Sequence, residues 1–182
     1  MLTDNSIIDD IKTIIAQSRE QAVRAVNHER TVMYWHIGQR IFEEEQRGKA
    51  RADYGAYLVQ MIAERLQPEF GSGFSKRQME LCRQFYRVFP IAHTLYSQLN
   101  WSQYKLLLRL DDKDKRAFYI AECVKNNWTV RQLERQINSQ LYERLLLSND
   151  KESVLAVARN ERQPVNPKEI IKDPMVLEFL GL

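Results

Sequence analysis

One helix can be predicted in detail from the stretch Asn126-Asn127-Trp128-Thr129-Val130-Arg131-Gln132-Leu133-Glu134-Arg135-Gln136-Ile137-Asn138-Ser139-Gln140-Leu141-Tyr142-Glu143-Arg144-Leu145. Thr129 and Gln132 have the spacing of a capping box, in which each side chain binds a backbone N–H group at the start of the helix. Trp128 and Leu133, on either side of this box, have the spacing of a hydrophobic staple. Apolar residues then recur at helical spacing at Val130, Leu133, Ile137, Leu141 and Leu145. The stretch therefore predicts a capped amphipathic helix with one buried face.

The other face of this predicted helix carries arginine and carboxamide side chains. It consists of Arg131, Gln132, Arg135, Gln136, Asn138 and Ser139. Helices that enter a groove of DNA use such side chains, because guanidinium and carboxamide groups match base edges and phosphates. We therefore assign Arg131, Gln132 and Arg135 to a candidate nucleic-acid-binding surface. The alternative is a surface helix whose polar face meets only water.

Two more helix starts repeat the order aromatic residue, hydroxyl cap, two residues, long polar residue and apolar residue. They read Phe74-Ser75-Lys76-Arg77-Gln78-Met79 and Trp101-Ser102-Gln103-Tyr104-Lys105-Leu106. The expected caps Ser75, Ser102 and Thr129 are each 27 residues apart. Equal steps of this size suggest stacked helical units, and coincidence between ordinary helix starts is the alternative.

Positive charge is concentrated in the middle of the chain. Residues 71–147 carry 13 Lys and Arg against 7 Asp and Glu, a net charge of +6, whereas residues 1–70 carry −2 and residues 148–182 carry −1. A localised positive field attracts polyanions, of which nucleic acid is the usual one. Soluble helical proteins also reach such a charge without binding DNA, so the charge supports this function without proving it.

The chain begins with a very long helical pattern, from about Asn5 to Arg47. Its apolar stripe consists of Ile7, Ile8, Ile11, Ile14 and Ile15, continued by Ala22, Val26, Met33, Ile37 and Ile41. A helix of this length would extend roughly 60 Å, more than a compact domain of this size, so we expect part of it to pack on a partner helix or a second subunit as a homodimer. Gly38 predicts a close helix approach or a bend. The run Glu43-Glu44-Glu45 fits a solvated face better than a metal site, because consecutive helical residues point in different directions.

A second helix is expected over about Ala52–Leu66, ended by Pro68 and the sequence Gly71-Ser72-Gly73, with Tyr57, Leu58, Met61, Ile62 and Leu66 facing inward. A third is expected from Ser75 to about Val88. Its polar side includes Lys76, Arg83 and Arg87, and Lys76 and Arg77 lie in its first turn. We assign these four residues to the candidate nucleic-acid-binding residues as well. Cations in a first turn oppose the helix dipole, which a bound phosphate would explain. The alternative is that long basic side chains tolerate this position without a ligand.

The sequence further predicts a helix-turn-helix-like unit. Helices are expected over Ser102–Leu110 and Asp112–Lys125, and Asn126-Asn127 then forms a tight turn into the helix capped by Thr129. The turn lacks the glycine that often assists this motif. One more helix is expected over Lys151–Arg159, before a segment punctuated by Pro164, Pro167 and Pro174.

The sequence offers no candidate residues for catalysis or for metal or cofactor binding. The three histidines lie in unrelated contexts, and no nucleophile motif or metal-ligand spacing is present. Cys82 and Cys123 lack partners at ligand spacing and are expected to be buried, reduced thiols. With 44% hydrophobic and 28% charged residues, and no apolar run long enough for a membrane span, the chain is expected to be a cytoplasmic, globular protein without a membrane partner.

Several motifs occur in an order that resembles the N-terminal domain of the YhcG-like bacterial proteins. They are Tyr34-Trp35-x-Ile37-Gly38-x-x-Ile41, Tyr54-Gly55, Phe70-Gly71-x-Gly73-Phe74-Ser75, Arg83-x-Phe85-Tyr86-x-x-Phe89-Pro90, Asn100-Trp101-Ser102-x-Tyr104, Arg116-Ala117-Phe118-Tyr119, Trp128-Thr129-Val130-Arg131-x-Leu133-x-Arg135-Gln136-Ile137, Leu141-Tyr142-Glu143-Arg144-Leu145 and Asp173-Pro174-x-Val176-Leu177-Glu178-Phe179-Leu180. In that family this helical domain usually precedes a PD-(D/E)xK nuclease domain, which implies a DNA-directed role. The family often has His after Trp-Ser, where Gln103 stands here, so a role that rests on that imidazole is in doubt.

The resemblance and the residues together give one expectation for the fold and two for the function. We expect an all-α fold, with a YhcG-like helical domain over residues 1–163 and a linker over residues 164–182. Within the domain, residues 1–70 would form the long helix and its hairpin partner, and residues 71–163 the basic helical part. The chain would bind or target DNA for a PD-(D/E)xK nuclease domain in cis or in trans, without catalytic residues of its own. The alternative is a helical dimerisation module that does not touch nucleic acid.

Overall fold

The computed structural model describes residues 4–47, 54–92, 95–148 and 151–158, and every regular element in these ranges is helical, as predicted. The helices are α1 (Asp4–Arg47), α2 (Tyr54–Phe70), the 3-10 helix η1 (Ser72–Phe74), α3 (Lys76–Val88), α4 (Trp101–Leu107), α5 (Lys113–Lys125), α6 (Val130–Asn138), α7 (Leu141–Leu147) and α8 (Lys151–Ala158). They form two compact units, Met1–Leu108 and Arg109–Leu182. The first unit therefore contains the long helix and also the start of the basic segment, while the predicted linker over residues 164–182 lies outside the described residues.

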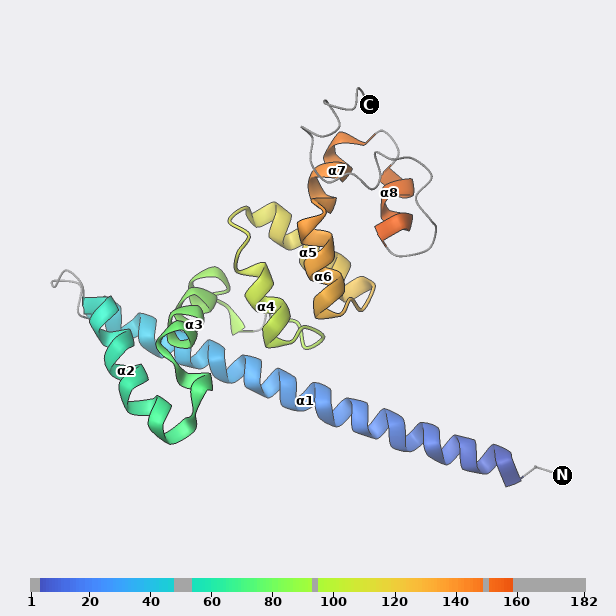
Figure 1. Ribbon diagram of the computed structural model, residues 1–182, viewed down its shortest axis with the longest axis horizontal. Helices are drawn as coiled ribbons and strands as arrows, with labels where there is room; N and C mark the ends of the chain where they lie inside the picture. The colour runs from blue at the N-terminus through green and yellow to red at the C-terminus, as the bar shows by residue number, and fades with distance from the viewer. Residues whose placement is uncertain (1–3, 48–53, 93–94, 149–150, 159–182) are drawn as a thin grey trace. The chain divides into compact units, whose positions relative to one another are not determined.

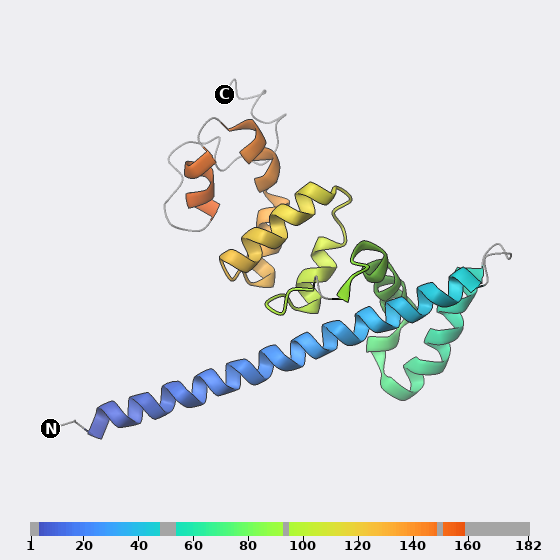
Figure 2. The same ribbon diagram turned by 180° about the vertical axis from the view of Figure 1, so that it is seen from behind.

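In the first unit, the C-terminal half of α1 packs against α3 (Figures 1 and 2). Gly38 lies where the two helices approach most closely, because a Cβ atom at this position would overlap the carbonyl oxygen of Cys82. Of the two roles predicted for Gly38, the structure confirms the close approach. Trp35 also joins the two helices, since its Nε1 donates a hydrogen bond of 2.6 Å to the carbonyl oxygen of Phe89 at the end of α3.

The core of the first unit is largely aromatic. Phe85, on α3, is fully buried, with its ring centroid 5.2 Å from that of Trp101 and 4.9 Å from that of Tyr104. Trp101 in turn packs against Tyr34 of α1 at 4.8 Å. Aromatic pairs at these separations add attraction beyond the area they bury. The cluster therefore links α1, α3 and α4.

Helix α4 begins at Trp101 and ends at Leu107, whereas the prediction was Ser102–Leu110, and its N-cap lies two residues before the predicted one. Asn100, and not Ser102, is its N-cap: the Asn100 side chain accepts from the backbone N–H of Gln103 at 3.1 Å, and the Gln103 side chain accepts from that of Asn100 at 2.8 Å. Asn caps a helix as well as Ser does, and the box it forms includes Gln103. Ser75 does occupy the N-cap of α3, although its side chain makes no capping bond. The true caps are therefore 25 and 29 residues apart, and the equal spacing that suggested repeats is wrong.

Helix α2 also differs from its prediction. It continues through Pro68 to Phe70, and the glycine-containing segment after it forms η1, while the predicted start at Ala52 lies outside the described residues. Val59 and Ala63 are buried, whereas Tyr57, predicted to face inward, is 65% exposed. Proline has no N–H group and its ring crowds the carbonyl of residue i−4, so Pro68 weakens the last turn, and the helix ends two residues later. The apolar face predicted for α2 is thus only partly covered.

The second unit is built around α5, α6 and α7. Tyr119, Leu133 and Leu141, one from each helix, are fully buried. The helix predicted to run from Thr129 to Leu145 is interrupted after Asn138, because Gln140 adopts the left-handed conformation with φ 51°. This break turns the chain, so that Leu141 and Leu145 reach the core from a separate helix.

Candidate nucleic-acid interface

The predicted capping box of α6 is present. The Thr129 hydroxyl accepts from the backbone N–H of Gln132 at 3.3 Å, and the Gln132 side-chain oxygen accepts from the backbone N–H of Thr129 at 2.8 Å and from its hydroxyl at 2.9 Å. Trp128 and Leu133 are both buried beside the box, as the staple spacing predicted. The start of α6 is therefore held from two sides. Because its oxygen belongs to the cap, Gln132 has only its NH2 group for a contact with a ligand.

A four-residue connection joins α5 to α6. Asp112 caps α5, since its carboxylate accepts from the backbone N–H of Asp114 at 2.7 Å and that of Lys115 at 3.1 Å. In the connection, Asn127 takes a left-handed conformation with φ 48°. Asparagine tolerates this conformation better than most residues. Asn127 thus supplies the turn for which the sequence has no glycine.

The exposed side of α6 is narrower than predicted. Arg131 and Arg135 are exposed, but Gln136 and Ser139 are buried. The Tyr119 hydroxyl donates to the carbonyl oxygen of Gln136 at 3.1 Å, which ties the end of α6 to α5. Burial raises the pKa of Tyr119 to about 12, so this donor stays protonated at neutral pH. The two arginines therefore project from a helix that is fixed at both ends.

On α3, the structure separates the four predicted cations into two pairs. Lys76 and Arg77 lie in the first turn and are exposed, and among the described residues neither forms an ion pair. Arg83 and Arg87 instead bind one carboxylate of α1: Arg83 Nη1 lies 2.5 Å from Glu45 Oε1, and Arg87 Nη2 lies 2.8 Å from Glu45 Oε2. Much of the positive charge of Arg83 and Arg87 is thus neutralised within the unit.

Glu45 is a structural residue that the sequence analysis missed. Its side chain is 8% exposed, although the run of three glutamates predicted a solvated face. Gly55 makes room for it, since a Cβ atom there would overlap the Glu45 carboxylate. The available signal was its spacing, because Glu45 follows Gly38 by seven residues, about two helical turns, and so lies on the face that packs against α3.

The candidate residues fall in different units. Lys76, Arg77, Arg83 and Arg87 belong to Met1–Leu108, whereas Arg131, Gln132 and Arg135 belong to Arg109–Leu182. Within each unit the candidates lie along a single helix, α3 in the first unit and α6 in the second. The α6 group is both exposed and firmly supported, and it forms the stronger candidate surface.

The described residues contain no group of three or more His, Cys, Asp or Glu side chains arranged to hold a metal ion. None of the helices in the same ranges combines the length and apolar character needed to cross a membrane. Cys82 and Cys123 are buried free thiols, as predicted.

Comparison with known proteins identifies related sequences. The family model described as the DUF1016 N-terminal domain matches residues 10–144. The chain is also 36% identical, over an alignment 208 positions long, to the protein named "Putative nuclease YhcG" of Escherichia coli (strain K12). This alignment covers 97% of the chain and 56% of the relative, so the chain spans little more than half the length of that protein. No solved structure matches the chain.

Proposed function

The chain belongs to the DUF1016 N-terminal domain family, and we propose that this nuclease-associated domain binds DNA in the bacterial cytoplasm and targets it for cleavage by a PD-(D/E)xK nuclease domain in cis or in trans. The observation that carries the proposal is the exposed pair Arg131 and Arg135 on a helix fixed by its cap and by Tyr119. A rigid helix that presents guanidinium groups is suited to a groove or backbone of DNA.

Each candidate residue has a distinct role in this proposal. Arg131 and Arg135 contact phosphates or base edges from α6, and Gln132 adds the NH2 group that its cap leaves available. Lys76 and Arg77, at the start of α3, contact the phosphate backbone of the DNA. Arg83 and Arg87 contribute less directly, because Glu45 already binds both; Arg87, with a side chain that is 48% exposed, is the better placed of the two to reach a phosphate.

Binding titrations at several salt concentrations test the proposal. We expect fluorescence anisotropy with labelled duplex, single-stranded or branched DNA to give an affinity that falls with salt, with a log–log slope of about −0.9 per phosphate contact on duplex DNA. Replacing Arg131 and Arg135 with Ala should weaken binding and flatten the slope. If the helix reads bases, replacing Arg131 or Gln132 should cost about 1–3 kcal/mol on a preferred site.

The matched control removes the same charge from a helix that carries none of the candidate residues. Arg19→Ala combined with Arg24→Ala on α1 should leave the affinity nearly unchanged, because neither residue belongs to the candidate surface. All variants must retain the thermal midpoint of the parent. The proposal fails if the parent binds none of the three kinds of DNA at low salt.

The proposal assigns cleavage to the nuclease domain and none to this chain. Hydrolysis of a phosphodiester by two metal ions needs a cluster of carboxylates that can hold them. We therefore expect the chain alone to leave plasmid DNA intact with Mg²⁺ or Mn²⁺. Metal-dependent nicking that survives repurification and disappears with one acidic residue would contradict this assignment.

A second candidate function is helical assembly, with formation of a homodimer through α1. One observation favours it: every residue from Ser6 to Val26 is exposed, including the isoleucine stripe. We expect light scattering at tens of micromolar to give a dimer, and Ile11→Asp with Ile15→Asp to give monomers. A monomeric parent would remove this candidate. Both candidate functions can hold for the same chain.

A further inference from the structure

An isolated helical arm is the least supported part of the first unit. The five isoleucines of α1 from Ile7 to Ile15 are 45–60% exposed, and every residue from Ser6 to Val26 is exposed. Helices in proteins gain most of their stability from packing of an apolar face, and this arm has no described element packed on its face. Exposed apolar surface of this extent usually marks an interaction site. The arm therefore needs a partner.

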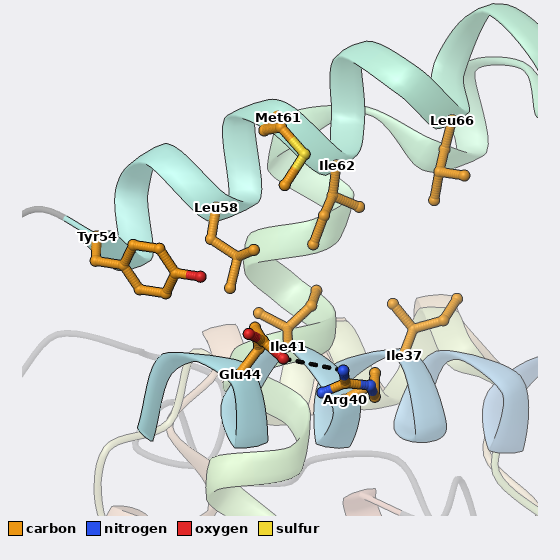
Figure 3. Close-up of a pocket in the computed structure, with 9 residues that line it drawn as sticks. All are labelled: Ile37, Arg40, Ile41, Glu44, Tyr54, Leu58, Met61, Ile62 and Leu66. Carbon is orange, nitrogen blue, oxygen red and sulfur yellow. Dashed lines mark hydrogen bonds and ion pairs between the residues drawn. The ribbon is translucent and has the colours of Figure 1, made fainter. Parts of the chain in front are cut away.

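A second uncovered apolar surface lies near the other end of the same helix. It is a groove of about 410 Å³ between α1 and α2, lined by Ile37, Arg40, Ile41, Glu44, Tyr54, Leu58, Met61, Ile62 and Leu66. Figure 3 shows Ile37 and Ile41 directed from α1 toward α2, with Leu58, Ile62 and Leu66 directed from α2 toward α1. Arg40 and Glu44 pair with each other at 2.9 Å along one side. The groove is therefore apolar inside and charged at its edge.

The stripe and the groove are connected along one helix. Twenty-two residues make close to six helical turns, so Met33 follows Ile11, and Ile37 follows Ile15, on nearly the same face. Val26 is 59% and Met33 38% exposed, so exposed apolar residues recur between the stripe and the groove, with the charged Glu29 and Arg30 among them. A second helix that packs along the stripe of α1 therefore extends toward the groove of the same molecule.

We propose that the groove between α1 and α2 receives the isoleucine stripe of a second copy of this chain, in an antiparallel dimer of two α1 helices. The proposal rests on the assembly function above and adds the binding surface and the orientation. A parallel pair would join stripe to stripe and leave both grooves open. The antiparallel pair fills each groove with the partner's stripe, and two-fold symmetry forms this contact twice.

The dimensions of the two surfaces agree. From Ile7 to Ile15 the stripe is about 12 Å long, and the wall of the groove from Tyr54 to Leu66 is about 18 Å long. If Ile11 of one molecule lies level with the point midway between Ile37 and Ile41 of the other molecule, the two-fold axis passes near residue 25 of both α1 helices. Ala22 and Ala25 then lie at the crossing, where small side chains allow close approach of two helices. The same register brings Asp10, at the side of the stripe, to the level of the partner's Arg40, which also pairs with Glu44 of its own chain.

Disulfide cross-linking of the whole chain tests both the surface and the orientation. We expect Ile11→Cys combined with Ile62→Cys to form a disulfide-linked dimer under mild oxidation. This bond must join two chains, since residues 11 and 37 of one helix are about 39 Å apart, whereas a disulfide needs Cα atoms within about 7 Å. Ile11→Cys alone should not cross-link, because the two copies of residue 11 would be about 42 Å apart. The native Cys82 and Cys123 do not interfere, because both are buried.

Aspartate substitutions give an independent measurement by light scattering. Ile11→Asp in the stripe and Ile62→Asp in the groove should each give a monomer of unchanged helical content. Thr13→Asp is the matched control: Thr13 is exposed but lies roughly 160° around the helix from both Ile11 and Ile15, so this variant should remain a dimer.

The outcomes separate this inference from the assembly function. A link between residues 11 and 62 with no link between two residues 11 supports the antiparallel dimer. A dimer that links residue 11 to residue 11, or that forms neither link, overturns the inference and leaves assembly intact. A parent chain that is monomeric overturns both, and the groove then belongs to another partner or another segment of the chain.

Discussion

Replacement of Gly38 by Ala tests whether the contact between α1 and α3 or the local helix preference determines stability at this position. Alanine favours a helix over glycine by about 1 kcal/mol, so preference alone predicts a more stable protein. The structure predicts the opposite. An added Cβ atom would overlap the carbonyl oxygen of Cys82 and lie 2.6 Å from its carbonyl carbon and 3.2 Å from Cβ of Tyr86. Carbon atoms in favourable contact lie about 3.5–4.0 Å apart.

The obstacle is mainly backbone, so it cannot rotate away. The two helices would have to separate along α3, which carries the buried Phe85 and the ion pairs with Glu45. Overpacking of this kind costs about 1–3 kcal/mol. With a cost near the upper end because backbone atoms must move, and a gain of about 1 kcal/mol from helix preference, we expect a net loss of about 2 kcal/mol.

Urea unfolding followed by far-ultraviolet circular dichroism measures this free energy directly. For a protein of this size the same loss lowers the thermal midpoint by about 4–8 °C. Glu43→Ala, at an exposed position of the same helix, is the control and should change stability by no more than about 0.5 kcal/mol. A Gly38→Ala protein as stable as the parent, or more stable, would refute the reasoning about close helix approach.

Three further predictions concern interactions that the structure assigns to single residues. Glu45→Ala should lower the free energy of unfolding by about 2–3 kcal/mol. This loss is smaller than that for breaking a fully buried ion pair, because Arg87 is half exposed. A loss as small as that of Glu43→Ala would contradict the structural role of Glu45. Asn100→Ala should cost about 1 kcal/mol through loss of the capping box, whereas Ser102→Ala should cost almost nothing; equal effects in urea unfolding would argue against the observed cap. Burial raises the pKa of Cys82 from 9.0 to about 12, so above pH 9 the unfolded chain releases a proton that the folded chain retains. Stability should therefore fall as the pH rises from 9 toward 12, and Cys82→Ala should make this fall shallower; an unchanged pH profile would contradict the burial effect.

Local patterns in the sequence predicted several elements well. The capping box at Thr129, the buried pair Trp128 and Leu133, and the extent of α1 and α3 all depend on residues within a few turns of one another. Apolar spacing and caps act through the helix backbone itself, so they can be recognised without knowledge of the fold. The same local signals support the assignment of Arg131 and Arg135 to an exposed face, which remains the basis of the proposed DNA contact.

Local patterns were less informative where two caps competed or a turn interrupted a regular period. Asn100 and Ser102 are both good cap residues, and only the fold selects the one whose box closes with Gln103. The apolar period from Val130 to Leu145 continues through Gln140, although the helix stops before it. The spacing of apolar residues indicates which residues are buried. The same spacing can continue across a turn that divides one predicted helix into two.

By itself, the sequence determined that the chain is helical, where most of its helices lie and which family it belongs to, because these follow from short-range preferences and from the order of its motifs. Only the tertiary structure decided the roles of Glu45, Arg83 and Arg87, which lie about 40 residues apart along the chain and meet because α1 packs on α3. Only the tertiary structure, likewise, distinguished the buried part of the apolar stripe on α1 from the exposed part. Periodicity predicts an apolar face, but burial depends on which other element lies against that face. Helix α3 packs on the C-terminal half of α1 and leaves the N-terminal half exposed.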